Sequence, residues 1–260
     1  MAKLGIIGGN GMLGTAIARG LLDSGMAGGD LWISSRSGRA GPLDDVPGLN
    51  VTRDSAELVA ACPVVLLSVP PAQADHIGVD AADRLVISVM AGVTLDRIGR
   101  ITGARRMVRA MSSPAAARRL AYSPFYCGVG VTGADRAAAR ALFAAVGLTD
   151  EVPDEAQIDD FTAMTGPVPG FVALFADAMV QFATDRGIAP EVADRAIRQL
   201  FLASGQLLSE EEATPGAQVQ AMLDYDGTTA AGLRAMIDSP LTRTIAEGLD
   251  AAARKAREIG

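Results

Sequence analysis

The spacing of apolar residues divides the chain into two parts. Up to about residue 150, short apolar runs alternate with stretches of helical pattern, as expected for parallel strands in βαβ units. Several runs are apolar at every position, which strands covered on both faces require. The predicted strands are residues 3–7, 30–34, 64–69, 85–90 and 106–110, with residues 121–131 as a further strand at the sheet edge.

Beyond about residue 155 the strand-like runs end and the pattern predicts long helices. These are residues 158–164, 170–186, 190–209, 214–223, 228–237 and 241–259. Residues 172–183 contain few polar positions, and a helix that is apolar all round is buried, often between subunits. We therefore expect the helical part to complete its core in a homodimer formed through these C-terminal helices.

The first predicted strand leads directly into a glycine-rich turn. Gly9-x-Gly11-x-x-Gly14 follows residues 3–7, and a helical stretch begins at about Thr15. In a dinucleotide site the first glycine allows the turn, the second lets the backbone approach the phosphates, and the third allows close packing. The positive end of the helix then faces the anion. A glycine triplet alone also fits a structural turn, but the flanking strand and helix favour a dinucleotide.

The end of the second predicted strand indicates which dinucleotide. An acidic residue there would accept a hydrogen bond from the ribose 2′-hydroxyl of NAD, whereas arginine accommodates the 2′-phosphate of NADP. No carboxylate is present in residues 31–39; Ser34, Ser35, Arg36 and Ser37 instead form a compact anion site, with Arg39 nearby. Guanidinium groups bind phosphate well, so NADPH is the predicted cofactor. The alternative is a solvated loop that carries arginines.

Composition narrows the functional classes. The net charge is −7 and the basic residues are scattered, which argues against a nucleic-acid partner. No apolar run is long enough to span a bilayer, and the N-terminus carries no signal pattern, so we expect a cytoplasmic protein without a membrane partner. Cys62 and Cys127 have no metal or redox spacing, so we expect no metal site and reduced, buried thiols.

At this point the chain resembles the pyrroline-5-carboxylate reductase family over nearly its full length. The likeness rests on the glycine-rich opening, on Ser-Val-Met-Ala-Gly-Val within residues 86–94, and on Arg-Met-Val-Arg-Ala-Met at 106–111. It continues with Thr-Ala-Met-Thr-Gly at 162–166 and Gly-Thr-Thr-Ala-Ala-Gly-Leu at 227–233. The opening Gly-Gly-Asn-Gly is closer to the related F420-dependent NADP reductases.

The resemblance implies an NADPH-binding Rossmann domain, a doubly wound parallel sheet, over residues 1–154. A helical substrate and dimerisation domain would follow over residues 155–260. The implied reaction is hydride transfer to the carbon of a small cyclic imine lying between the domains, converting 1-pyrroline-5-carboxylate to proline. Thr229 matches the threonine proposed to hydrogen-bond the imine nitrogen, and Thr228 belongs to the same loop. Thr228 would also suit a helix N-cap, and Tyr225 is either a hydroxyl donor or a packing residue.

The predicted cofactor contacts share a place in the glycine-rich turn or at the end of a predicted strand. They are Gly9, Asn10, Gly11, Met12, Leu13, Ser35, Arg36, Val69, Pro70, Ala91 and Gly92.

The departures from the family gather in the substrate site. Ser-Pro-Gly-Gly becomes Asp-Tyr-Asp-Gly at 224–227, and the Met-Pro-Asn strand end becomes Met-Ser-Ser at 111–113. Val-Lys-Pro becomes Val-Pro-Pro at 69–71, and Ser-Gly-Pro-Ala-Tyr becomes Pro-Val-Pro-Gly-Phe at 167–171. Each aspartate close to a substrate carboxylate would cost about 1–4 kcal/mol. One hypothesis is a substrate that lacks the carboxylate or is cationic; the other is that both aspartates face solvent.

Other readings remain open or are disfavoured. His76 suits a surface or helix-start position better than general acid chemistry, and Asp177 is expected to pair with an arginine if it does not face the cleft. A β-hydroxyacid dehydrogenase needs a lysine in its second domain, but beyond Lys3 only Lys255 is present. An F420-dependent NADP reductase fits the opening but not the helical tail. A catalytically silent NADPH-binding sensor or scaffold is the alternative from another class.

Overall fold

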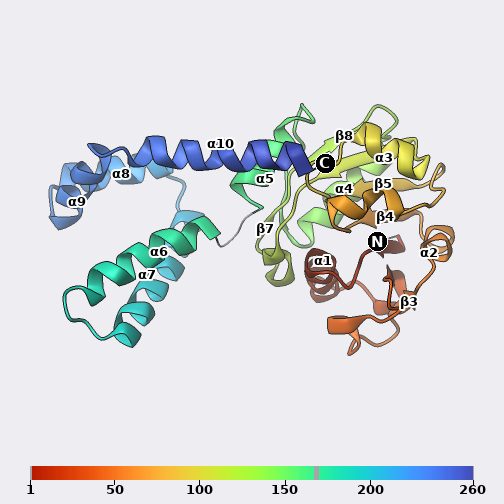
Figure 1. Cartoon of the computed structure of the whole chain (residues 1–260), viewed down its shortest axis with the longest axis horizontal. Coiled ribbons are helices and arrows are strands. Elements are labelled where there is room, and N and C mark those ends of the chain that lie inside the picture. Colours follow the sequence, from red (N-terminus) through yellow and green to blue (C-terminus); the bar gives the residue numbers. More distant parts are fainter. Residues whose placement is uncertain (1, 167–169, 260) are drawn as a thin grey trace. The chain divides into compact units, whose positions relative to one another are not determined.

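The computed structural model describes residues 2–166 and 170–259, and by internal contacts the chain forms two compact units (Figure 1). Unit 1 comprises Met1–Val168 together with Leu249–Gly260, and unit 2 comprises Pro169–Gly248. Helices α6 to α9 belong to unit 2, and α10 (Leu241–Ile259) begins in unit 2 and ends in unit 1.

Unit 1 is built on a seven-stranded sheet with the order β3-β2-β1-β4-β5-β6-β8. All neighbours are parallel except β8, which runs antiparallel to β6. The strands are β1 (Leu4–Ile7), β2 (Leu31–Ser34), β3 (Asn50–Thr52), β4 (Val64–Leu67), β5 (Leu85–Ser88), β6 (Arg106–Ala110) and β8 (Phe125–Cys127). The five predicted parallel strands are confirmed, whereas β3 was missed because its three residues include no buried position.

Helices cover both faces of this sheet, which makes it doubly wound as predicted. One core joins the sheet to α1 (Met12–Asp23) and α4 (Gly133–Ala144). The other joins it to α2 (Ser55–Ala61) and α3 (Leu95–Thr102). Because side chains alternate along a strand, Leu4 and Ile6 of β1 enter the first core while Ile7 enters the second.

The expected edge strand at residues 121–131 is divided in two. β7 (Ala121–Tyr122) pairs with β9 (Gly147–Leu148) in a separate two-stranded sheet, and only β8 joins the main sheet. Pro124 lies between them and has no N–H to donate to a ladder, but its carbonyl accepts a hydrogen bond from Met111 N at 3.1 Å.

The helix that opens the predicted helical part packs within unit 1. This helix, α5 (Gln157–Met164), is fixed to the sheet by the small core of Met111, Val152 and Ile158. Arg109 of β6 is 2% exposed and pairs with Asp159 of α5 and with Glu155, the latter at 3.4 Å. Buried charges need such partners, because leaving one unpaired is costly.

Unit 2 contains α6 (Gly170–Thr184), α7 (Pro190–Glu210), α8 (Pro215–Tyr225) and α9 (Thr228–Ile237). The helices start and end within a few residues of the predicted bounds. Helices α6 and α7 pack through an edge-to-face contact of Phe175 and Phe201, with ring centroids 6.0 Å apart. Within a single chain α6 has no buried residue and Leu174 is 72% exposed, so the expected burial of residues 172–183 between subunits stays a prediction.

Candidate functional site

The glycine-rich turn connects the end of β1 to the start of α1. Gly8 takes the left-handed conformation (φ 83°), and a Cβ there would lie 2.6 Å from the Ser68 carbonyl oxygen. The sequence assigned the turn to Gly9, but the positive φ falls on Gly8. A Cβ at Gly14 would lie 2.6 Å from the Gly8 oxygen, so this glycine lets α1 pack against the turn.

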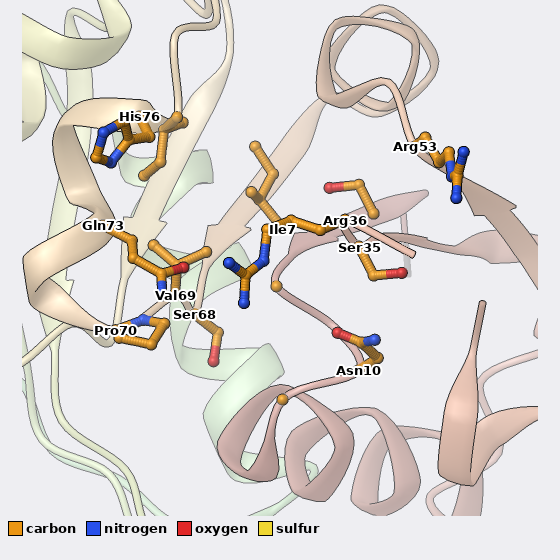
Figure 2. Close-up of a pocket in the computed structure, with 14 residues that line it drawn as sticks. Ile7, Asn10, Ser35, Arg36, Arg53, Ser68, Val69, Pro70, Gln73 and His76 are labelled. Atoms are coloured by element: carbon orange, nitrogen blue, oxygen red, sulfur yellow. The ribbon is translucent and has the colours of Figure 1, made fainter. Parts of the chain in front are cut away.

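A cavity of about 300 Å³ opens at this turn, at the carboxyl ends of β1, β2 and β4 (Figure 2). The first N–H groups of a helix have no partner within the helix, and those of α1 begin beside Gly11, its N-cap. The lining residues include Arg36, Arg53 and His76 but no carboxylate. They are Ile7, Gly8, Asn10, Gly11, Ser34, Ser35, Arg36, Arg53, Ser68, Val69, Pro70, Gln73, His76 and Ile77.

The loop after β2 is a hydrogen-bonded turn. The Ser35 hydroxyl donates to the Arg39 carbonyl at 2.9 Å and accepts from Arg39 N at 3.2 Å. Gly38 N donates to the Ser35 carbonyl at 3.0 Å. Ser35 thus shapes the loop, while the Arg36 side chain is exposed and lines the cavity.

The cavity brings together six of the eleven predicted cofactor residues. Asn10, Gly11, Ser35, Arg36, Val69 and Pro70 line it. The other five do not: Gly9 and Gly92 are buried, Leu13 and Ala91 are half-buried, and Met12 is 78% exposed at the start of α1.

Several lining residues were missed by the sequence analysis. Arg53 follows β3, the strand that was not predicted. Ser68 follows β4, and its buried hydroxyl has no hydrogen-bond partner among the described residues. Gln73 and His76 belong to the 3₁₀ helix η3 (Pro71–His76). His76 was expected at a helix start, but it is the last residue of this helix.

The predicted catalytic residues lie at the junction of α8 and α9. Tyr225 was expected in a loop, but it ends α8 and is 87% exposed, so it makes few packing contacts within its own chain. Thr228 is the first residue of α9 and the N-cap is Gly227, so the N-cap expectation for Thr228 is wrong. Thr228 and Thr229 are both exposed.

The two aspartates of this junction make different local contacts. Asp226 takes the left-handed conformation (φ 56°) as the C-cap of α8, and its carboxylate pairs with Arg234 at 2.7 Å. Asp224 accepts a hydrogen bond from Gln220 Nε2 at 2.8 Å and pairs with no cation within the described ranges. One of the two negative charges is therefore compensated inside the chain.

The remaining departures are placed as follows. Ser112 and Ser113 are buried, and the Ser112 hydroxyl lies 2.9 Å from that of Ser123, so the Ser112 hydroxyl is hydrogen-bonded within unit 1. Pro167 and Pro169 lie outside the described residues. Asp177 is exposed, and no arginine pairs with it in the part of the chain that the structure describes.

The described residues show no reactive thiol, metal-ligand group or membrane-spanning helix. Burial raises the pKa of both Cys62 and Cys127 to about 11, so these free thiols stay protonated near neutral pH. Within residues 2–166 and 170–259, no three His, Cys, Asp or Glu side chains are grouped to hold a metal ion. None of the helices in those ranges combines the length and apolar character needed to cross a bilayer.

Two family models match successive parts of the chain. Residues 3–92 match the model described as NADP oxidoreductase coenzyme F420-dependent. Residues 155–259 match the model described as pyrroline-5-carboxylate reductase dimerisation. The first match agrees with the likeness seen in the glycine-rich opening, and the second covers the helical part.

Relatives match over nearly the whole chain. A pyrroline-5-carboxylate reductase from Mycobacterium leprae is 31% identical over 254 residues, covering 92% of this chain and 85% of the relative. Pyrroline-5-carboxylate reductase 2 from Bacillus subtilis is 29% identical over 267 residues, covering 100% and 95%. The solved pyrroline-5-carboxylate reductase from Coxiella burnetii has a TM-score of 0.90 at 25% identity and covers 100% of this chain and 98% of its own. The chain therefore belongs to the pyrroline-5-carboxylate reductase family.

Proposed function

We propose that this protein is an NADPH-dependent oxidoreductase that reduces the C=N bond of 1-pyrroline-5-carboxylate to give proline. The observation that carries the proposal is the cavity at the glycine-rich turn, which combines the start of α1 with Arg36 and Arg53 and contains no carboxylate. Helix N-termini and guanidinium groups are the features that bind dinucleotide phosphates. Membership of the family supports the substrate.

The residues of the cavity fit NADPH. Gly8 and Gly11 keep the turn free of side chains where a pyrophosphate would approach the helix start, and Arg36 favours a ribose that carries a phosphate. We keep the predicted contacts of Gly9, Met12, Leu13, Ala91 and Gly92 as proposals. When bound, NADPH supplies the hydride that the imine carbon accepts.

The chain itself has only to orient the imine and supply a proton to its nitrogen. We assign hydrogen bonding of the imine nitrogen to Thr229, with Thr228 and Tyr225 as further hydroxyl groups of the same junction. All three side chains are exposed in the single chain, and none of their hydroxyls donates a hydrogen bond within the described ranges. The product amine thus takes its hydride from the cofactor and its proton from a hydroxyl or solvent.

We further propose a homodimer through the C-terminal helices. The family model for residues 155–259 is named for dimerisation, and the apolar side chains of unit 2 are largely exposed in one chain. With this we keep residues 1–154 as the NADPH-binding domain and 155–260 as the substrate and dimerisation domain. We place the protein in the cytoplasm, with a small-molecule substrate and neither membrane nor nucleic acid as a partner.

Turnover of purified protein tests the proposed activity. With NADPH and 1-pyrroline-5-carboxylate we expect proline to form at an enzyme-like rate, on the order of 1–1000 s⁻¹. Thr229→Val, which keeps the shape of the side chain but removes its hydroxyl, should lower kcat about 10²-fold. Tyr122→Phe, far along the sequence in β7, is the matched loss of a hydroxyl and should leave turnover unchanged. NADPH oxidation without proline, or none at all, would contradict the proposal.

A second candidate is reduction of a cyclic imine that lacks the carboxylate. The observation in its favour is Asp224, which stands where the family has serine and has no cationic partner within the described ranges. A substrate carboxylate near it would be repelled. Rates for 1-pyrroline and for 1-pyrroline-5-carboxylate, each with the parent and with Asp224→Ser, separate the two candidates. If the parent prefers the carboxylate substrate, and Asp224→Ser does not improve its KM, the second candidate is wrong.

A further inference from the structure

The end of β3 brings a second arginine to the nucleotide cavity. Strands β2 and β3 pair in parallel with Ser34 opposite Thr52, and Ser35 N donates to the Thr52 carbonyl at 3.2 Å. Arg53 is the residue directly after Thr52. Strand pairing therefore fixes Arg53 beside the loop that follows β2.

Arg53 is held on this loop by one edge of its guanidinium. Its Nε donates to the Ser37 carbonyl at 3.1 Å, and its stem lies over Gly38, where an added Cβ would come within 2.6 Å of Arg53 Cγ. The two terminal amino groups, Nη1 and Nη2, make no hydrogen bond or ion pair with any described residue. One edge of the group is anchored and the other is available.

The acidic residues next to Arg53 bond elsewhere. The Asp54 carboxylate accepts from Ala56 N at 2.8 Å as the N-cap of α2. Glu57 accepts from the Thr52 hydroxyl at 2.5 Å. Neither carboxylate neutralises the Arg53 guanidinium, so its charge is left for a ligand.

Arg53 and Arg36 reach the cavity from different elements. In Figure 2, Arg36 extends toward the wall that carries Val69 and Gln73, and Arg53 lies on the opposite side from His76. The Ser35 hydroxyl is already bonded to Arg39. The lining carries two guanidinium groups and no carboxylate, so the cavity favours an anionic ligand, and on the Arg53 side a phosphomonoester, with close to two negative charges at neutral pH, would suit the free guanidinium edge.

We propose that Arg53 is a specificity-determining residue that binds the ribose 2′-phosphate and so makes the protein prefer NADPH over NADH. This inference rests on the proposed dinucleotide function. Arg53 donates its two terminal amino groups to the phosphate oxygens, while its Nε keeps the group fixed on Ser37. The preference for the phosphorylated cofactor then comes from β3 as well as from the loop after β2.

Dissociation constants of NADPH and NADH for the full chain test this role. Arg53→Gln should weaken NADPH binding about 30-fold, which corresponds to about 2 kcal/mol, and change NADH binding less than about twofold, because NADH has no 2′-phosphate. Arg39→Gln removes the same charge from the loop on which Arg53 lies, but the Arg39 side chain does not line the cavity. It should change NADPH binding less than about threefold, since an isolated exposed charge acts weakly through water.

A purely structural role for Arg53 makes a different prediction. If Arg53 only supports the turn through Ser37, Arg53→Gln weakens NADPH and NADH equally, and Arg53→Lys, which also loses the Nε bond, does the same. If Arg53 binds the phosphate, Arg53→Lys retains most of the NADPH preference because it retains the charge. Equal losses for both cofactors, or no loss for NADPH, overturn the inference while leaving the proposed function intact. A parent protein that binds neither dinucleotide overturns both.

Discussion

The two units of this chain bury apolar surface very differently. The three buried apolar clusters all lie in unit 1 and include large side chains such as Ile17, Phe125 and Phe143. In α6 to α9 of unit 2, the described residues that are buried are two alanines, Ala193 and Ala230. Large apolar side chains of unit 2 instead remain exposed, among them Leu174, Phe182 and Leu202 at 57–72%.

This contrast indicates that unit 1 supplies its own core and unit 2 does not. Soluble monomers rarely expose large contiguous apolar surfaces, and obligate dimers often have no stable folded monomer. Unit 2 also carries Thr228 and Thr229, the hydroxyl groups proposed to bind the imine, whereas the proposed nucleotide cavity belongs to unit 1. The predictions below separate the two units, from the largest expected effect to the smallest.

Charges placed on the apolar side chains of α6 should have the largest effect. The double variant Leu174→Asp with Phe182→Asp should dissociate the proposed homodimer and remove most of the helical structure of unit 2, because a second copy would no longer complete its core. Sedimentation and circular dichroism measure both changes. NADPH binding should remain, since its cavity lies in unit 1.

A control is Gln181→Asp, which places one such negative charge at an exposed polar position of α6. We expect it to stay dimeric. If the double variant also remains dimeric and helical, the inference that a second copy completes unit 2 is wrong.

Removing a large side chain from the core of unit 1 should have the second largest effect. Phe143 is fully buried and stacks on Phe125 with ring centroids 6.2 Å apart. Phe143→Ala should lower the free energy of unfolding of unit 1 by about 4 kcal/mol. In urea the loss should be the same at all protein concentrations, and a loss that vanishes at high concentration would contradict a self-sufficient core.

The ion pairs of Arg109 with Asp159 and Glu155 test whether α5 is stabilised by its contacts with unit 1. Arg109→Met leaves Asp159 and Glu155 without their cation and should cost about 3 kcal/mol. Adding Asp159→Leu should restore much of this, because apolar replacements of buried ion pairs are often tolerated. If Arg109→Met is neutral in urea unfolding of unit 1, α5 is not held by these ion pairs.

Thiol reactivity should give the smallest effect. Cys62 and Cys127 are the only cysteines and both lie in unit 1. Burial raises their pKa from 9.0 to about 11, so the thiolate fraction at pH 8 falls about 100-fold. Alkylation should be slow in the folded protein and remain slow in the α6 double variant. Folding raises the pKa of these thiols, so the protonated thiols also contribute to the free energy of unfolding. This contribution is complete below pH 9 and is lost as the pH rises toward 11. Fast alkylation at pH 8 would contradict the raised pKa values of the buried Cys62 and the half-buried Cys127.

The sequence predicted the fold well where apolar periodicity is strong. The five parallel strands and the C-terminal helices were predicted because their apolar residues form continuous runs or recur with helical spacing. The prediction from apolar periodicity missed β3, whose three residues carry no such pattern. It also gave one strand at residues 121–131, where Pro124 divides the segment. The missing β3 is also why Arg53 was overlooked.

The candidate site was predicted in part. Residues of contiguous motifs, such as Gly11 and Arg36, lie at the cavity because strand–turn–helix geometry is local. Val69 and Pro70 were also predicted, but their neighbours Ser68 and Gln73 were missed because the sequence pattern does not show which side chains at the end of β4 and in η3 face the cavity. The end of α8 was placed two residues early, at residue 223 instead of Tyr225, because Asp226, rather than a glycine, takes the left-handed position that ends this helix, whereas the start of α9 at Thr228 was predicted correctly.

The most direct test of the central claim follows the hydride itself. Proline formed from 1-pyrroline-5-carboxylate with NADPH that carries deuterium at the transferable C4 position should be one mass unit heavier, with the label on the carbon of the former C=N bond. Unlabelled proline, or no proline while the protein still binds NADPH, would contradict the account.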